Sequence, residues 1–122
     1  MSADRRARLA PVFDRYAAEC RSRGETLVSL LADDAVSLDV QAVILHSHSL
    51  AGSGATMGAE KLSQDARQLE ETAKRLQEAG RGPDAAEQKA MAALAASCLE
   101  QAKGFDAATM LDAFIAKMFA GS

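Results

Sequence analysis

A stripe of apolar residues at helical spacing, between residues 62 and 76, constrains the fold of this chain more than any other feature. Its members are alternately four and three residues apart, which is the narrow seam that a helix presents inside a bundle: Leu62, Ala66, Leu69, Ala73 and Leu76. We therefore expect a helix from about residue 59 to residue 79 that packs against other helices along its length.

The same periodicity predicts a long first helix, a break and a second helix. Apolar residues recur at helical spacing from about Ala3 to Ala32 and keep their phase through Gly24. The pair Asp33-Asp34 interrupts the pattern. We expect Ser37 to cap the second helix, with Asp39 in its first turn, where the helix dipole favours an acid.

A helical wheel assigns one face of the second helix to the core, and the glycines from Gly54 to Gly58 are expected to end this helix. The residues expected to face the core are Val40, Val43, Ile44, Ser47, Ala51 and Gly54.

Turn and capping signals divide the remainder of the chain into two further helices. The segment Gly80-Arg81-Gly82-Pro83 ends the third helix, and Asp84 with Glu87 forms a capping-box pattern. A fourth helix then runs to about Lys103, and Asp106 is expected to cap a last helix.

These elements predict an all-α fold, an antiparallel up-and-down four-helix bundle with an additional C-terminal helix. The composition agrees, because Ala, Leu, Glu, Gln, Lys and Arg dominate while β-branched and aromatic residues are scarce. Short connections between long helices make neighbouring helices antiparallel. We expect one helical domain over residues 1–122.

Charge and cysteine content narrow the classes of function. The net charge of −3 argues against a nucleic-acid-binding protein, which normally carries a basic face. Cys20 and Cys98 fall on apolar helical positions and are expected to be reduced and buried. No uncharged run is apolar enough for a membrane span. We expect a soluble cytoplasmic protein that does not bind membranes.

Val40 to Ala59 contains no Lys, Arg, Asp or Glu, although a quarter of the chain is charged. His48 lies in this window on the shoulder of the core face, and Gly52 one turn later leaves its ring uncovered. Its other neighbours on the shoulder are Gln41, Leu45 and Ala55. His46 points elsewhere, so we expect no metal site from the two histidines.

Each of these residues also has an ordinary structural interpretation. His48 could be a half-buried ring that makes one hydrogen bond. Gly52 could serve the close packing of a neighbouring helix. Glu70 could be a surface acid paired with Lys74 four residues later.

The string His48-Ser49-Leu50-Ala51-Gly52-Ser53, followed by Gly58-Ala59, resembles the signature of histidine phosphotransfer (HPt) domains. The stripe from Leu62 to Leu69, with Glu70 after it, is similar to the third helix of that family. Helix order and spacing extend the resemblance over about residues 8–103. The long first helix and the extra last helix look similar to the phosphoacceptor domain of chemotaxis-type histidine kinases.

The resemblance implies that His48 is the phosphoacceptor, commonly through Nε2, and that Glu70, 22 positions downstream, holds Nδ1. Geometry supports the pairing, because a hairpin turning near Thr56 to Gly58 leaves His48, nine residues before Met57, and Glu70, thirteen residues after it, within about 6 Å of the same height. The family's lysine three residues after the histidine is Ala51 here. We expect Arg67, or else Lys74, to neutralise the phosphate instead.

The implied function is that of a histidine phosphotransfer protein in a two-component phosphorelay. It would take a phosphoryl group from a receiver aspartate or a kinase and pass it to a response-regulator aspartate. It would be a phosphocarrier without autonomous catalytic activity, independent of ATP, with no cofactor or metal of its own and with Mg²⁺ on the partner receiver.

Partners would be response-regulator receiver domains and a sensor or hybrid histidine kinase. The residues expected at the docking surface are Gln41, Ile44, Leu45, Gly52, Ala55, Glu71 and Lys74. Two other readings stay open: an adaptor that binds receivers without being phosphorylated, and the phosphoacceptor domain of a larger kinase. We expect a monomer, with dimerisation through the last helix as the alternative.

Overall fold

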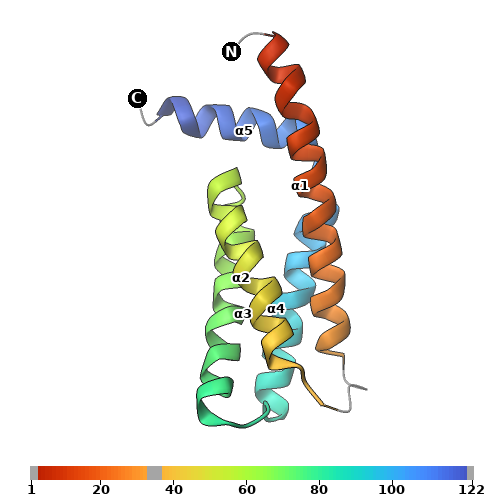
Figure 1. The fold of residues 1–122 in the computed structure, drawn as a ribbon, viewed down its shortest axis with the longest axis vertical. Helices are drawn as coiled ribbons and strands as arrows, with labels where there is room; N and C mark the ends of the chain where they lie inside the picture. The colour runs from red at the N-terminus through yellow and green to blue at the C-terminus, as the bar shows by residue number, and fades with distance from the viewer. Residues whose placement is uncertain (1–2, 33–36, 121–122) are drawn as a thin grey trace.

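The computed structural model describes residues 3–32 and 37–120, and within these ranges the chain is helical and contains no strand. Five helices follow in order (Figure 1): α1 (Ala3–Leu30), α2 (Val40–Met57), α3 (Glu60–Ala79), α4 (Ala85–Lys103) and α5 (Ala107–Ala120). The predicted all-α class is confirmed.

The first four helices alternate in direction and form the predicted up-and-down bundle (Figure 1). Helix α2 packs on α3, α3 on α4, α4 on α1 and α1 on α2, which closes the bundle. Helix α1 extends beyond the tip of the α2–α3 hairpin, and α5 crosses that end of the bundle. The additional C-terminal helix is therefore a cap across one end.

The core lies along the seam that the sequence predicts. Every residue of the α3 stripe from Leu62 to Leu76 is buried. Cys20 and Cys98 are free and buried in the same core, as expected for structural cysteines. Gly24 is buried where α1 meets α4, and a Cβ there would lie 3.0 Å from the Cα of Leu99. This glycine allows the close approach of two helices.

The cap of α2 corrects one expectation. Asp39, not Ser37, is the N-cap, and its carboxylate accepts a hydrogen bond of 3.0 Å from the backbone N–H of Ala42. Either residue type can cap a helix, and the aspartate lies directly before the first helical residue. The predicted break at Asp33-Asp34 lies outside the described residues.

The buried face of α2 is rotated slightly from the one expected. Leu50 is fully buried, although the wheel did not assign it to the core, whereas Val40 and Ile44 are only half-buried. Ser47 is fully buried and its hydroxyl donates a hydrogen bond of 2.6 Å to the carbonyl of Val43. The core direction therefore lies between Ser47 and Leu50.

The α2–α3 hairpin fixes the register of the two helices. Gly58 ends α2 with a positive φ of 84°, and Ala59 N–H donates to the Gly54 carbonyl at 2.8 Å. A Cβ on Gly54 would lie 3.1 Å from the Ala59 carbonyl oxygen, so a side chain there would force the turn to shift by a few tenths of an ångström. The Ser63 hydroxyl donates to the Ala51 carbonyl at 2.6 Å and ties the helices together.

The last two helices begin as the sequence predicts. Asp84 and Glu87 form a complete capping box at the start of α4. Asp106 accepts a hydrogen bond of 3.0 Å from the backbone N–H of Thr109 in the first turn of α5. Phe114 of α5 packs edge-on against the ring of Phe13, with ring centres 5.5 Å apart.

Ion pairs connect α5 to the other helices. Arg6 pairs with Asp112, and Lys117 pairs with Glu60 at 3.1 Å. Of the helices that the structure describes, none is long and apolar enough to cross a membrane.

Candidate functional site

His48 stands on α2 with its ring exposed and one nitrogen held by α3. The side chain is 73% exposed, and Nδ1 lies 2.6 Å from Oε2 of Glu70. Because the hairpin closes at Gly58, about midway between His48 and Glu70, these two residues lie at the same height of the bundle. The alternative interpretation of His48 as a half-buried histidine is therefore wrong, although the single hydrogen bond that it included is present.

Glu70 is buried, and it holds two partners through one oxygen. Its exposed fraction is 7%, and the Lys74 ammonium lies 3.1 Å from the same Oε2 that contacts His48. Burial raises the pKa of this carboxyl, but the hydrogen bonds from Lys74 and His48 outweigh burial and bring the pKa below its ordinary value. The pairing with Lys74 was foreseen as an alternative, but the description as a surface acid was wrong.

The Glu70 carboxylate fixes the tautomer of the His48 ring. An ionised carboxylate only accepts hydrogen bonds, so Nδ1 of His48 is the donor. A neutral imidazole carries one proton, which leaves Nε2 with an unshared electron pair. The site therefore presents a nitrogen nucleophile on an exposed ring, with a carboxylate behind it.

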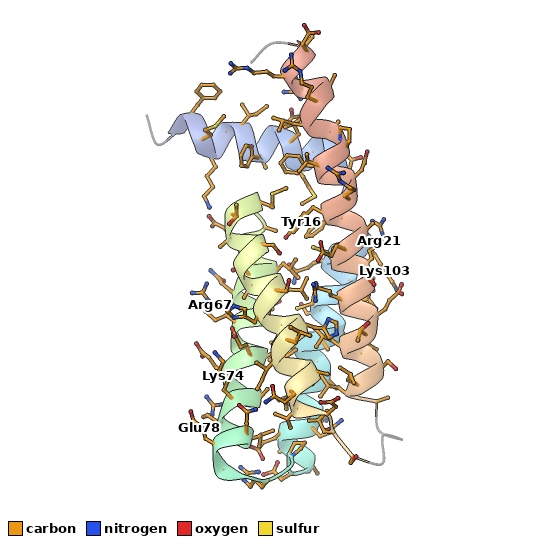
Figure 2. All side chains as sticks on the ribbon, in the orientation of Figure 1. Tyr16, Arg21, Arg67, Lys74, Glu78 and Lys103 are labelled. Atoms are coloured by element: carbon orange, nitrogen blue, oxygen red, sulfur yellow. The ribbon has the colours of Figure 1, made fainter. Side chains whose placement is uncertain are left out.

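A shallow hollow of about 310 Å³ lies beside the ring, between α2 and α3. It is lined by His48, Ala51, Gly52, Arg67, Glu70, Glu71 and Lys74. Arg67 and Lys74 follow one another along the outer side of α3 (Figure 2). Within the described part of the chain, Arg67 makes no hydrogen bond or ion pair. The hollow thus contains one engaged cation, on Lys74, and one available guanidinium, on Arg67.

Position 51, where the resemblance implied a lysine, carries an alanine at the edge of the core and of the hollow. Ala51 is only 4% exposed and packs in the core between the helices. Gly52, by contrast, is exposed, and a Cβ built on it would meet nothing within 4 Å. Close packing of a neighbouring helix therefore does not explain this glycine, and that alternative is wrong.

The residues expected at a docking surface lie in two rows on either side of the hollow. Gln41, Leu45, Gly52 and Ala55 are exposed on the same face of α2 as His48, and Ile44 beside them is half-buried. On α3, Glu71 and Lys74 are exposed. Leu45 is 63% exposed, which is high for a leucine. Of this set, Gly52, Glu71 and Lys74 line the hollow beside His48, and the role of all seven residues in docking stays a prediction.

His46 lies on the other side of α2, as predicted, and contacts α1. Its Nδ1 is 3.0 Å from Nη1 of Arg23. Among the residues that the structure describes, no group of three His, Cys, Asp or Glu side chains could hold a metal ion. The partnership with Arg23 was missed, because no local spacing connects residues on two different helices.

Comparison with known proteins adds one finding. The model of the Hpt domain family matches residues 12–114, which includes both helices of the site. No curated protein and no solved structure matches the chain significantly.

Proposed function

The chain belongs to the Hpt domain family, and we propose that His48 is the residue through which it receives and passes on a phosphoryl group. Hpt domains are phosphocarriers of two-component phosphorelays, and they work with receiver domains and histidine kinases. In this proposal the donor is a receiver aspartate or a kinase, and the acceptor is the aspartate of a response regulator.

One observation carries the proposal: an imidazole that is 73% exposed has its Nδ1 held at 2.6 Å by a buried carboxylate. A solvent-exposed histidine on a helix ordinarily has no fixed tautomer, because either nitrogen can carry the proton. Here the proton is kept on Nδ1, so Nε2 points its electron pair outward. This is the state that attack on an acyl phosphate needs.

The transfer step follows from this geometry. The Nε2 electron pair forms a bond to phosphorus while the bond between phosphorus and the aspartate oxygen breaks, and the receiver regains its carboxylate. The imidazole ring gains positive charge as the new bond forms. Glu70 accepts a hydrogen bond from the Nδ1–H group throughout, so the proton stays on the ring. The negative charge of Glu70 stabilises the charged ring.

The hollow beside the ring supplies positive charge for the phosphoryl oxygens. Arg67 is the first candidate, because its guanidinium lines the hollow without an ion pair in the described residues. Lys74 lines the same hollow but is engaged with Glu70 at 3.1 Å. We assign the phosphoryl contact to Arg67 and the tuning of Glu70 to Lys74.

The partner is proposed to supply the remaining chemistry. Mg²⁺ prefers several oxygen ligands, and the acidic pocket of a receiver domain provides them. Glu70, the carboxylate nearest to the ring, is already engaged by His48 and Lys74. We include in the proposal that this chain acts without a cofactor of its own and without ATP, as a cytoplasmic monomer that docks through the exposed rows around His48.

The test is phosphoryl transfer from a panel of phosphorylated receiver domains to three proteins: wild type, His48→Gln and His46→Gln. We expect wild type and His46→Gln to gain an acid-labile, base-stable phosphate and His48→Gln to gain none. His46→Gln is the matched control, because it removes the other imidazole of the same helix. Receiver binding without phosphate on the wild type would favour the adaptor and contradict the proposal.

A further inference from the structure

The two histidines of α2 stand only two positions apart but have partners of opposite charge. His48 faces the carboxylate of Glu70 on α3, and His46 faces the guanidinium of Arg23 on α1. The Nδ1 atom of each ring is therefore constrained in the opposite way: it faces an acceptor in His48 and a donor in His46.

We propose that Arg23 is a positioning residue that locks His46 in the Nε2–H tautomer, so that His48 is the one nucleophilic imidazole of α2. The tautomer part rests only on the contacts around His46. The selection of His48 for phosphorylation rests on the proposed function above.

The tautomer follows from the donors and acceptors available. A guanidinium has five N–H donors and no acceptor, so Nδ1 of His46 must accept the hydrogen bond that spans 3.0 Å. The single proton of the neutral ring is then on Nε2. Neither nitrogen of His46 has a free electron pair, because one is protonated and the other is occupied.

The surroundings of Arg23 and His46 maintain this arrangement. Glu19, one turn earlier on α1, contacts the guanidinium at 3.0 Å and fixes its position. The Arg23 side chain is only 25% exposed, and its contact with His46 is partly buried. Burial, and then the charge of Arg23, lower the pKa of His46, which favours the neutral ring.

The lock prevents phosphorylation at an unproductive position. A phosphoryl group on His46 would lie on the α1 side of α2, away from Arg67 and Lys74. It would lack the cations of the hollow and the docking rows around His48. Arg23 thus restricts the reaction to the face from which a partner retrieves the group.

The first experiment reads the tautomers directly. Long-range ¹H–¹⁵N correlation spectra of the ¹⁵N-labelled protein should show His46 protonated at Nε2 and His48 protonated at Nδ1. In Arg23→Met, the His46 signals should shift toward a mixture of both tautomers, while those of His48 stay in place. The matched control is Arg21→Met, because Arg21 points away from α2 (Figure 2) and its removal should leave both rings unchanged. His46 protonated at Nδ1 in the wild type would overturn the proposal.

The second experiment tests selection with phosphoramidate, a small phosphoryl donor that needs no partner protein. An imidazole nitrogen forms the new bond to phosphorus as the P–N bond of the donor breaks, and ammonia leaves. Peptide mapping should place the phosphate on His48 in the wild type. In His48→Gln/Arg23→Met the yield on His46 should rise several-fold over His48→Gln alone.

The two experiments separate the possible failures. If His46 of the double variant changes tautomer but gains no phosphate, the assignment of selection to Arg23 is wrong. If the wild type takes no phosphate on His48 from phosphoramidate or from any receiver, the proposed function fails, while the tautomer spectra still decide the role of Arg23.

Discussion

The chemistry of the site converges on one oxygen atom, because Oε2 of Glu70 takes both Nδ1 of His48 and Nζ of Lys74. Burial alone would favour the neutral acid, which could donate a proton and would not define the tautomer of the ring. The hydrogen bonds from Lys74 and His48 lower the pKa of this carboxyl and favour the ionised form, which only accepts hydrogen bonds. In the proposed function, a lysine that makes no bond to the ring therefore supports the reactivity of His48.

Glu70→Gln removes the carboxylate on which the proposed reactivity of His48 depends. The amide keeps the shape of the side chain but loses the charge that holds Nδ1–H and stabilises the phosphorylated ring. We expect phosphoryl transfer to His48 to slow by about 10- to 100-fold, the usual effect of losing such a supporting partner. The measurement is single-turnover transfer from a phosphorylated receiver. Glu78→Gln, further along the same outer side of α3 (Figure 2), is the control and should transfer normally.

At the scale of helices, the start of α4 combines a capping box with an ion pair, since Arg81 contacts the Glu87 carboxylate at 2.7 Å. The hydrogen bond from Arg81, followed by that from the Asp84 backbone, lowers the pKa of Glu87 from 4.5 to about 2. A carboxyl with a depressed pKa stabilises the fold above its unfolded pKa, and this stabilisation is lost as the pH falls through the folded value.

Glu87→Gln should therefore lower the free energy of unfolding at neutral pH, with the difference from wild type shrinking between pH 4.5 and about 2. Urea denaturation across this range measures the effect. Glu100→Gln, whose carboxylate lies 3.8 Å from Lys103, should change little at any pH. A difference for Glu87→Gln that is independent of pH would contradict the ionic origin of the effect.

Two glycines of α2 form a matched pair that separates folding from function. Gly52→Ala should raise the free energy of unfolding by roughly 0.5–1 kcal/mol, because open space surrounds the new methyl group. Gly54→Ala should lower it by about 1–3 kcal/mol, because its Cβ would lie 3.1 Å from the Ala59 carbonyl oxygen and from Ser63 Cβ.

The effect of Gly52→Ala on function should be opposite to its effect on stability. Gly52→Ala places a methyl group one turn from His48, on the face expected to meet a partner, so receiver binding should weaken although the protein becomes more stable. Affinity for a phosphorylation-competent receiver, measured by calorimetry, tests this. Unchanged affinity would mean that Gly52 lies outside the docking surface.

Sequence patterns predicted those features that depend on one helix at a time. The seam of α3 and the capping box at Asp84 follow from local spacing, and both are present. Leu50 was missed because a wheel centred on Val40 is rotated from the true core direction. The burial of Glu70 and the contact of Arg23 with His46 depend on how helices pack, and no local pattern contains that information.

At the scale of the whole molecule, the hollow beside His48 and the C-terminal helix occupy separate parts of the fold, and α5 reaches the docking residues only where Lys117 donates a hydrogen bond of 3.4 Å to the Ala55 carbonyl. His48 and its hollow lie between α2 and α3, whereas α5 crosses the end of the bundle (Figure 1) and is tied there by Phe114, Lys117 and Asp112. The hairpin at Gly58 fixes the register of α2 and α3, and the core of the four-helix bundle packs beneath both helices. We infer that α5 contributes to stability and not to the geometry of the site.

Phe114→Ala tests this division. The ring of Phe114 is half-buried against Phe13, so its removal should lower the free energy of unfolding by about 1–3 kcal/mol. At a temperature where the variant stays folded, the rate of phosphoryl transfer to His48 should equal that of wild type, because no contact of Phe114 reaches the α2–α3 hollow. Slower transfer by a fully folded variant, with its His48 tautomer unchanged in ¹⁵N spectra, would show instead that a partner contacts α5 during transfer. The docking surface would then extend from the rows around His48 to the capped end of the bundle.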